Sequence, residues 1–213
     1  MASSRPRTSQ VLPETESQQA TAGRREVSAS ALAVLAVVAV FAYTVDRVSK
    51  ILVVENLTLG APVDVIGQLL QFRYVENPGA AFSLGSGSTW IFAIIAAVVT
   101  IFIVIFARRI RSTGWAVLFG MLLGGNLGNL TDRLIRPPGF GIGHVVDFLQ
   151  VYGFPAIFNV ADIAIVSSMG LFILLTIRGV GLDGKRSSKT AEPQEPATLD
   201  SRATGTPAPT DQA

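Results

Sequence analysis

The sequence contains no cysteine and a single histidine, and these two shortages exclude several kinds of site. Without cysteine the chain forms no disulfide bond, carries no thiol nucleophile and offers no thiolate to a metal. His144 alone argues against a zinc centre, because such centres use three or four protein ligands. A Ser–His–Asp triad would also need His144, yet its loop offers no serine elbow, and no G-x-S-x-G motif occurs in the apolar segments. Carboxylates therefore remain as the candidates for chemistry.

Charged residues are also scarce, at 15% of the 213 residues, whereas 49% are hydrophobic. A membrane-spanning helix needs about 20 mostly apolar residues. Runs near this length predict four spans, at about 29–45, 89–107, 114–131 and 156–177. The third run contains five glycines and two asparagines, so it is predicted to be an inner helix packed by its neighbours.

The basic residues predict how the chain crosses the membrane. Segments 1–28, 108–113 and 178–213 hold twelve of the seventeen Lys and Arg residues, and segments 46–88 and 132–155 hold the other five. By the positive-inside rule, both termini and the short connection at 108–113 are predicted to lie in the cytoplasm. The two longer connections then face outward.

The two ends of the chain differ in composition from its middle. Residues 1–28 and 179–213 are rich in Ser, Thr, Pro, Gln and Ala, and are predicted to be disordered cytoplasmic tails. Residues 29–178 are predicted to form one membrane domain. Within it, residues 51–85 are predicted to contribute a small extracytoplasmic β-sheet, because "LQFRY" at 70–74 alternates apolar and polar side chains. The predicted fold class is an all-α membrane protein with four transmembrane helices and this small sheet.

Four aspartates are expected at one membrane boundary, the outer one. They close or open predicted spans, or stand in an outer loop: Asp46, Asp132, Asp147 and Asp162. Ionisable residues at a membrane edge are candidates for functional sites.

Most of these aspartates also have a purely structural explanation. Asn159 and Asp162 have the spacing of a helix cap, in which the carboxylate binds backbone N–H groups. Asp132 could be neutralised by Arg133 or Arg136. Asp46 could form an ion pair with Arg47 or with Lys50.

Two carboxylates held close together cannot both ionise without cost, so one keeps a proton while the other deprotonates water. Such a pair supports peptide hydrolysis, with the neutral acid polarising the scissile carbonyl. Two alternatives stay open at this level. One is a small proton-coupled membrane transporter, which would place carboxylates at mid-membrane depth. The other is a membrane assembly protein without catalysis.

Five motifs, in order, carry a resemblance to a known family. The motifs are "DRVSK" at 46–50, "ENPGAAFSL" at 76–84, "GGNLGNLTDRL" at 124–134, "GHVVDF" at 143–148 and "FNVAD" at 158–162. With these motifs the sequence resembles lipoprotein signal peptidase (signal peptidase II), the membrane aspartic protease of bacterial lipoprotein maturation, over about residues 30–178.

The resemblance implies that Asp147 and Asp162 are the catalytic pair. It implies further residues that shape the site or bind substrate: Asp46, Asn77, Gly79, Phe82, Asn129, Asp132, Arg133, Asn159 and Ala161. It also implies four transmembrane helices with an extracytoplasmic β-cradle, and a reaction without metal or cofactor.

The implied activity is removal of the signal peptide from a prolipoprotein, just before a cysteine that carries diacylglycerol. The implied partners are this diacylglyceryl-prolipoprotein and membrane lipid, with no nucleic acid. We expect a monomer in the bacterial cytoplasmic membrane, with its site near the outer face. Two positions depart from the family pattern: Arg47 replaces glutamine, and Asn126 replaces the commoner alanine, which questions close packing there.

Overall fold

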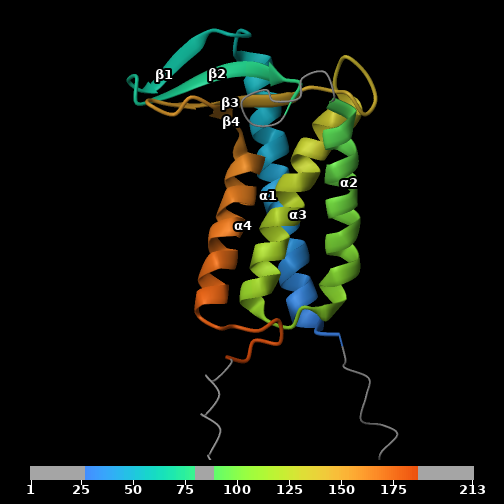
Figure 1. The fold of residues 1–213 in the computed structure, drawn as a ribbon. Helices are drawn as coiled ribbons and strands as arrows, with labels where there is room; N and C mark the ends of the chain where they lie inside the picture. The colour runs from blue at the N-terminus through green and yellow to red at the C-terminus, as the bar shows by residue number, and fades with distance from the viewer. Residues whose placement is uncertain (1–26, 80–88, 187–213) are drawn as a thin grey trace, which may run out of the picture.

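The computed structural model describes residues 27–79 and 89–186. Four long helices stand side by side, and a small sheet covers one end of the bundle (Figure 1). The helices are α1 (Ala29–Asn56), α2 (Thr89–Phe106), α3 (Thr113–Ile135) and α4 (Val160–Ile177). The 3-10 turn η3 (Ala107–Arg109) continues α2. Residues 1–26, 187–213 and Phe82 lie outside the described residues, so the predictions made for them are not tested.

Membrane-spanning character is evident in three of the described helices. Ala29–Asn56, Thr89–Arg109 and Val160–Ile177 are long and apolar enough to cross a membrane by length and composition. Helix α3, of 23 residues, is not among these candidate spans, and it contacts all three other helices. Its predicted place as an inner helix therefore matches the packing.

Glycines allow α3 to approach its neighbours closely. A Cβ on Gly120 would lie 2.8 Å from the carbonyl oxygen of Leu35 on α1, and one on Gly125 would lie 2.6 Å from that of Ala161 on α4. Asn126 points instead toward α2, where its amide donates hydrogen bonds of 2.7 Å to Ala96 O and to the Thr100 hydroxyl. The asparagine thus joins two helices and leaves the glycine contacts undisturbed.

Two helix boundaries differ from the predicted spans. Helix α1 continues to Asn56, well beyond the predicted end of its span near residue 45. Its charged residues Asp46 and Lys50 are fully buried inside the bundle, so they do not end the helix. Helix α4 begins at Val160 and not near residue 156, because Asn159 caps it and the residues just before form a strand.

The sheet is antiparallel, with the order β1-β2-β3-β4. Its strands are β1 (Pro62–Ile66), β2 (Leu70–Asn77), β3 (Val145–Val151) and β4 (Ile157–Phe158). The predicted strand at 70–74 is confirmed as part of β2. Half of the sheet, however, comes from beyond residue 85, so the predicted sheet region was too narrow.

The sequence predicts a loop around Asp147, whereas these residues form strand β3. Its residues 145–148 are all buried, so the alternation typical of a half-exposed strand is absent. Val146 and Phe148 pack against Tyr74 of β2 and Val53 of α1. The other face of β3 looks toward a cavity, described below. Neither face of β3 is open to solvent at residues 145–148, so Asp147 lies in a buried strand.

The chain also packs at the opposite end of the bundle, after α4. Trp115 of α3 donates its indole N–H to Val180 O at 2.9 Å. The backbone N–H groups of Arg111 and Ser112 both donate to Leu182 O, at 2.9 and 3.0 Å. Residues up to 186, at the start of the region assigned to the C-terminal tail, therefore turn back under the helices.

Candidate active site

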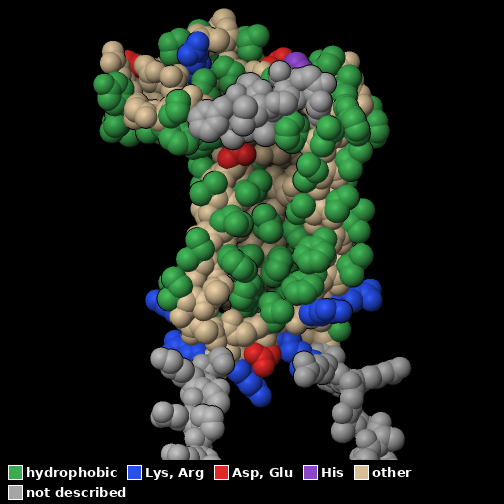
Figure 2. Space-filling view, viewed as in Figure 1, with side chains coloured by type: hydrophobic (Ala, Val, Ile, Leu, Met, Phe, Trp, Pro, Cys, Tyr) green, Lys and Arg blue, Asp and Glu red, His purple; other side chains and the backbone are tan. Residues whose placement is uncertain are grey.

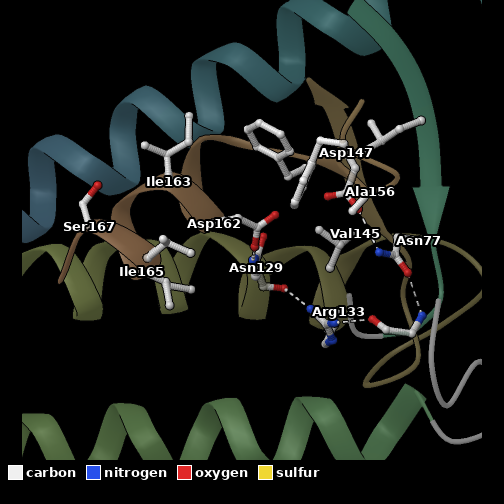
Figure 3. Close-up of a pocket in the computed structure, with 15 residues that line it drawn as sticks. Asn77, Asn129, Arg133, Val145, Asp147, Ala156, Asp162, Ile163, Ile165 and Ser167 are labelled. Carbon is white, nitrogen blue, oxygen red and sulfur yellow. Dashed lines mark hydrogen bonds between the residues drawn. The ribbon is translucent and has the colours of Figure 1, made fainter. Parts of the chain in front are cut away.

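A cavity of about 460 Å³ opens between α3, α4 and the sheet (Figure 3). The sequence-predicted residues that line it are Asn77, Gly79, Asn129, Arg133, Asp147 and Asp162. They come from four separate elements or their ends, namely β2, α3, β3 and α4. The fold therefore brings the two aspartates of the predicted pair to one space.

Asp147 enters the cavity from β3, on the strand face opposite Val146 and Phe148. Its side chain is only 3% exposed. Asn77 donates its amide to Asp147 Oδ2 at 2.8 Å, and Asn159 donates to Oδ1 at 2.6 Å. Burial, as the largest cause, raises the pKa of Asp147 from 3.8 to about 7; the negative charge of Asp162 also raises it, while the amide hydrogen bonds lower it. Asp147 can therefore hold a proton near neutral pH.

Asp162 enters the cavity from the first turn of α4. Asn159 is the N-cap of this helix, and its side chain accepts the backbone N–H of Asp162 at 3.0 Å. Asp162 Oδ2 accepts the backbone N–H of Asn159 in return, at 3.1 Å. This reciprocal capping box, expected from the spacing, is confirmed. It fixes the direction in which the carboxylate leaves the helix.

Asn159 connects the two aspartates. Its backbone N–H binds Asp162, and its side-chain amide binds Asp147. The same amide donates to Asn129 Oδ1 at 3.1 Å, and the Asn129 amide donates to Asp162 Oδ1 at 2.9 Å. Asn159 is completely buried, so these contacts form without competition from water. Two asparagines thus hold both carboxylates in a fixed relation.

Arg133 stands on the α3 side of the cavity, one turn beyond Asn129 (Figure 3). Its guanidinium donates to the backbone carbonyl of Gly79 at 2.8 Å and lies 5.8 Å from the ring centre of Phe92 on α2. The Gly79 N–H in turn donates to Asn77 Oδ1 at 2.9 Å. Arg133 therefore links α3 to the segment that ends β2, and places a positive charge beside the carboxylates.

A second group of charges lies behind the cavity, and its three central members, Asp46, Lys50 and Asp132, are fully buried. Lys50 forms ion pairs of 2.9 Å with Asp46 and with Asp132. Asp132 is further paired with Arg47 and, at 2.8 Å, with Arg136. The sequence alternatives that paired Asp46 with Lys50 and Asp132 with Arg136 are therefore confirmed.

This buried ion cluster also joins elements of the fold. Asp46 Oδ1 accepts the backbone N–H of Ala161 at 2.9 Å, which ties α1 to the start of α4. Asp132 Oδ2 accepts the backbone N–H of Val146 at 3.3 Å, which ties α3 to β3. The sequence prediction grouped Asp46, Asp132 and Ala161 with the site; in the structure they do not line the cavity and support the elements that do.

Sequence reasoning did not include Lys50 among the site residues. Its ammonium donates to Asn129 Oδ1 at 2.9 Å, and the Asn129 amide nitrogen donates to Asp162 Oδ1. The Asn129 side chain therefore connects Lys50 with Asp162. The signal was the spacing of Asp46 and Lys50, four residues apart, which places both on one helix face. Within residues 27–79 and 89–186, no three His, Asp or Glu side chains are grouped to hold a metal ion.

The chain was compared with known protein families and solved structures. The family model described as "Signal peptidase (SPase) II" matches residues 38–178. Lipoprotein signal peptidase of Leifsonia xyli is 61% identical over 168 residues, covering 79% of this chain and 78% of that protein. The Streptomyces coelicolor protein of the same name is 48% identical, covering 77% and 78%, and that of Mycobacterium tuberculosis is 45% identical, covering 71% and 75%.

Two solved structures, both described as bacterial membrane enzymes, share the fold. The first superposes with a TM-score of 0.65 at 26% identity, covering 80% of this chain and 99% of that one. The second has a TM-score of 0.61 at 28% identity, with coverages of 73% and 99%. Together with the matched family model and relatives, these likenesses show that the chain belongs to the signal peptidase II family, membrane peptidases that remove signal peptides from prolipoproteins.

Proposed function

We propose that Asp147 and Asp162 are the catalytic pair of this peptidase. The single observation that carries the proposal is the way Asn159 binds both residues, with its side chain on one carboxylate and its backbone on the other. Both carboxylates line one cavity, and a pair of this kind can divide the acid and base roles.

We assign the acid and base roles from the difference between the two environments. Asp147 is nearly buried and its pKa is raised to about 7, so it holds the shared proton. Asp162 is half-buried and acts as the base that takes a proton from water. The water oxygen then attacks the scissile carbonyl carbon, while the proton on Asp147 stabilises the charge growing on the carbonyl oxygen. When the C–N bond breaks, the leaving nitrogen takes the proton held by Asp162.

The substrate is a prolipoprotein cleaved just before its diacylated cysteine, as the family resemblance implies. The cavity supports this, because beyond its polar end it is lined by apolar residues of β4 and the exposed face of α4: Ile157, Phe158, Ile163 and Val166. Acyl chains can stay in lipid along this face while the peptide reaches the carboxylates. Both members of the proposed pair come from one chain, so the proposed reaction does not need a second copy.

The molecule crosses the membrane four times, with the sheet outside. Figure 2 shows hydrophobic side chains along the helices, and most of the visible Lys and Arg at the end away from the sheet. That end carries Arg108, Arg109, Arg111 and Arg178. By the positive-inside rule it faces the cytoplasm, as do both termini, and the cavity lies near the outer face of the bacterial cytoplasmic membrane.

The test is cleavage of a diacylated prolipoprotein by Asp147→Asn and Asp162→Asn, each purified and reconstituted. Each substitution should lower the turnover number by about 100- to 10,000-fold, the range for loss of a general acid or base. Asp64→Asn, the same change on exposed strand β1, is the matched control and should cleave normally. Near-normal turnover by either cavity variant, with the protein folded, would remove that residue from the pair.

A further inference from the structure

Lys50 is the only lysine among the residues that the structure describes to be buried without any exposed side-chain surface. It stands on α1, which contributes no residue to the cavity lining. Three oxygen atoms lie 2.9 Å from its ammonium: Asp46 Oδ2, Asp132 Oδ2 and Asn129 Oδ1. The ion pairs explain how a buried ammonium is neutralised, but they do not explain the third contact. That contact leads toward the catalytic pair.

The third contact helps to fix which way the Asn129 amide faces. An ammonium only donates hydrogen bonds, so Asn129 must present its oxygen to Lys50. The Asn129 nitrogen then points to Asp162 Oδ1, to which it donates at 2.9 Å. The reversed amide would place an NH2 group against the ammonium and an oxygen against the carboxylate. Asn159 donates to the same oxygen and favours the same orientation, and because a hydrogen bond from a charged donor is roughly twice as strong as a neutral one, Lys50 contributes the larger part.

We infer that Lys50 is a positioning residue for the peptidase reaction, which holds Asn129 in the orientation that supports Asp162 and places a fixed positive charge behind the catalytic pair. This inference rests on the proposed roles of Asp147 and Asp162. It adds to the proposed reaction a residue, Lys50, that contacts neither Asp147 nor Asp162.

The charge of Lys50 also acts on Asp147, whose pKa it lowers against the larger effect of burial. Other charged or titratable groups stand on the elements around the pair: Asp46 and Arg47 on α1, Asp132 and Arg133 on α3, Arg136 after α3, Glu76 on β2 and His144 before β3. Lys50 differs from the other basic residues among these because it alone binds a side chain that binds the pair.

The test is the pH profile of Lys50→Met, a neutral side chain of similar length, on a diacylated lipopeptide. We expect the turnover number to fall about 10- to 100-fold, with KM changed by less than about 3-fold, because substrate contacts are untouched. The alkaline limb of the profile should move to higher pH, since the charge that favours ionised Asp147 is gone. Arg136→Gln is the matched control: it removes a cation from Asp132 without touching Asn129, and should leave the limb in place.

Loss of Lys50 could also unfold the protein, because it leaves buried carboxylates unpaired. The double variant Lys50→Met with Asp46→Asn avoids this, since Asp132 keeps Arg47 and Arg136. It is compared with Asp46→Asn alone, and the same fall in turnover and shift of the limb are expected. If the alkaline limb did not move and the turnover number did not change in that comparison, the inference about Lys50 would be wrong. The proposed catalytic pair would still hold in that case, provided that Asp147→Asn and Asp162→Asn are inactive. Active aspartate variants would instead overturn the proposed function itself.

Discussion

The side-chain amide of Asn159 donates a hydrogen bond of 2.6 Å to Asp147, and both residues are almost completely buried. Asn159 also caps the helix that carries Asp162. The N-terminus of α4 is therefore attached to the sheet through the same residue that orients the second aspartate. Helix capping is common in proteins for stability alone. Here the cap additionally sets the relation between two carboxylates on different elements.

The raised pKa of Asp147 predicts how stability and activity depend on pH. The pKa is 3.8 in the unfolded chain and about 7 in the folded one, so the folded state binds more protons between these values. The free energy of unfolding should therefore fall as pH rises from about 4 to about 7, by on the order of 4 kcal/mol at most. Cleavage should decline above about pH 7 as Asp147 loses its proton. Thermal unfolding in detergent and cleavage rates across this range measure both effects.

Two variants assign this pH effect to its residue. Asp147→Asn should show a smaller fall of the free energy of unfolding over this pH range, because the contribution of Asp147 is absent. His144→Gln, which removes the single histidine, should keep it. If the histidine variant lost the effect and the aspartate variant kept it, the assignment to Asp147 would be wrong.

Asn129 and Arg133 should matter less than the aspartates, because neither exchanges a proton with substrate. Asn129→Ala removes one hydrogen bond to Asp162, and Arg133→Ala removes a positive charge and the bond to Gly79 O. We expect each to lower kcat/KM by about 10- to 1,000-fold, a loss typical of a positioning or electrostatic contact. Steady-state kinetics with a lipidated precursor measures this. Unchanged kinetics in both variants would show that neither positions the reaction.

Several features of the site follow from local sequence rules. The capping box of Asn159 and Asp162 has its usual spacing, and the strand around Phe72 alternates as a half-buried strand does. Such patterns depend only on neighbours along the chain, so a single sequence reveals them. The pairing of Asp46 with Lys50 is equally local, one helical turn apart.

Other features depend on contacts between distant segments and could not be predicted this way. Asp147 is predicted in an outer loop because it lies between two predicted spans, yet its strand pairs with β2 along one edge, packs against Val53 of α1 on one face and borders the cavity on the other. Asp46 looked like the end of a span, because nothing in α1 shows that Lys50 will meet Asp132 of α3. The hydrogen bond from Lys50 to Asn129 likewise joins residues 79 positions apart. A buried charge is read correctly only once its partner is known.

The C-terminal region should divide into a part that supports the bundle and a part that does not. A chain ending at Arg186 keeps the contacts of Val180 and Leu182 with Trp115 and the start of α3. It should cleave as the full chain does. A chain ending at Arg178 loses these contacts and should unfold at a lower temperature, since buried donors lose their acceptors. Thermal unfolding and cleavage of both truncations, beside the full chain, provide the measurement; equal stability of the two would contradict the supporting role.

Gly128 should be the most sensitive glycine of α3 for activity. A Cβ there would collide with Asp46 Oδ2 and lie 2.9 Å from its Cγ, and would also meet Ala161 Cβ at 3.4 Å. Asp46 is fully buried and bound to Lys50 and to the Ala161 N–H, so it has little room to move. Gly128→Ala should therefore push α1 and α4 away from α3, destabilise the protein by about 1–3 kcal/mol and lower turnover, because α4 carries Asp162.

Gly170→Ala is the matched control for this substitution. Gly170 lies in α4, and a Cβ on it meets nothing within 4 Å. Alanine favours a helix over glycine by up to about 1 kcal/mol, so this variant should be as stable as the parent or slightly more stable. Unfolding temperatures and cleavage rates of both variants separate crowding from helix propensity. Because the two changes are chemically identical, a Gly128→Ala protein that behaves like Gly170→Ala would show that α1, α3 and α4 are not packed as tightly around Asp46 as the structure has them.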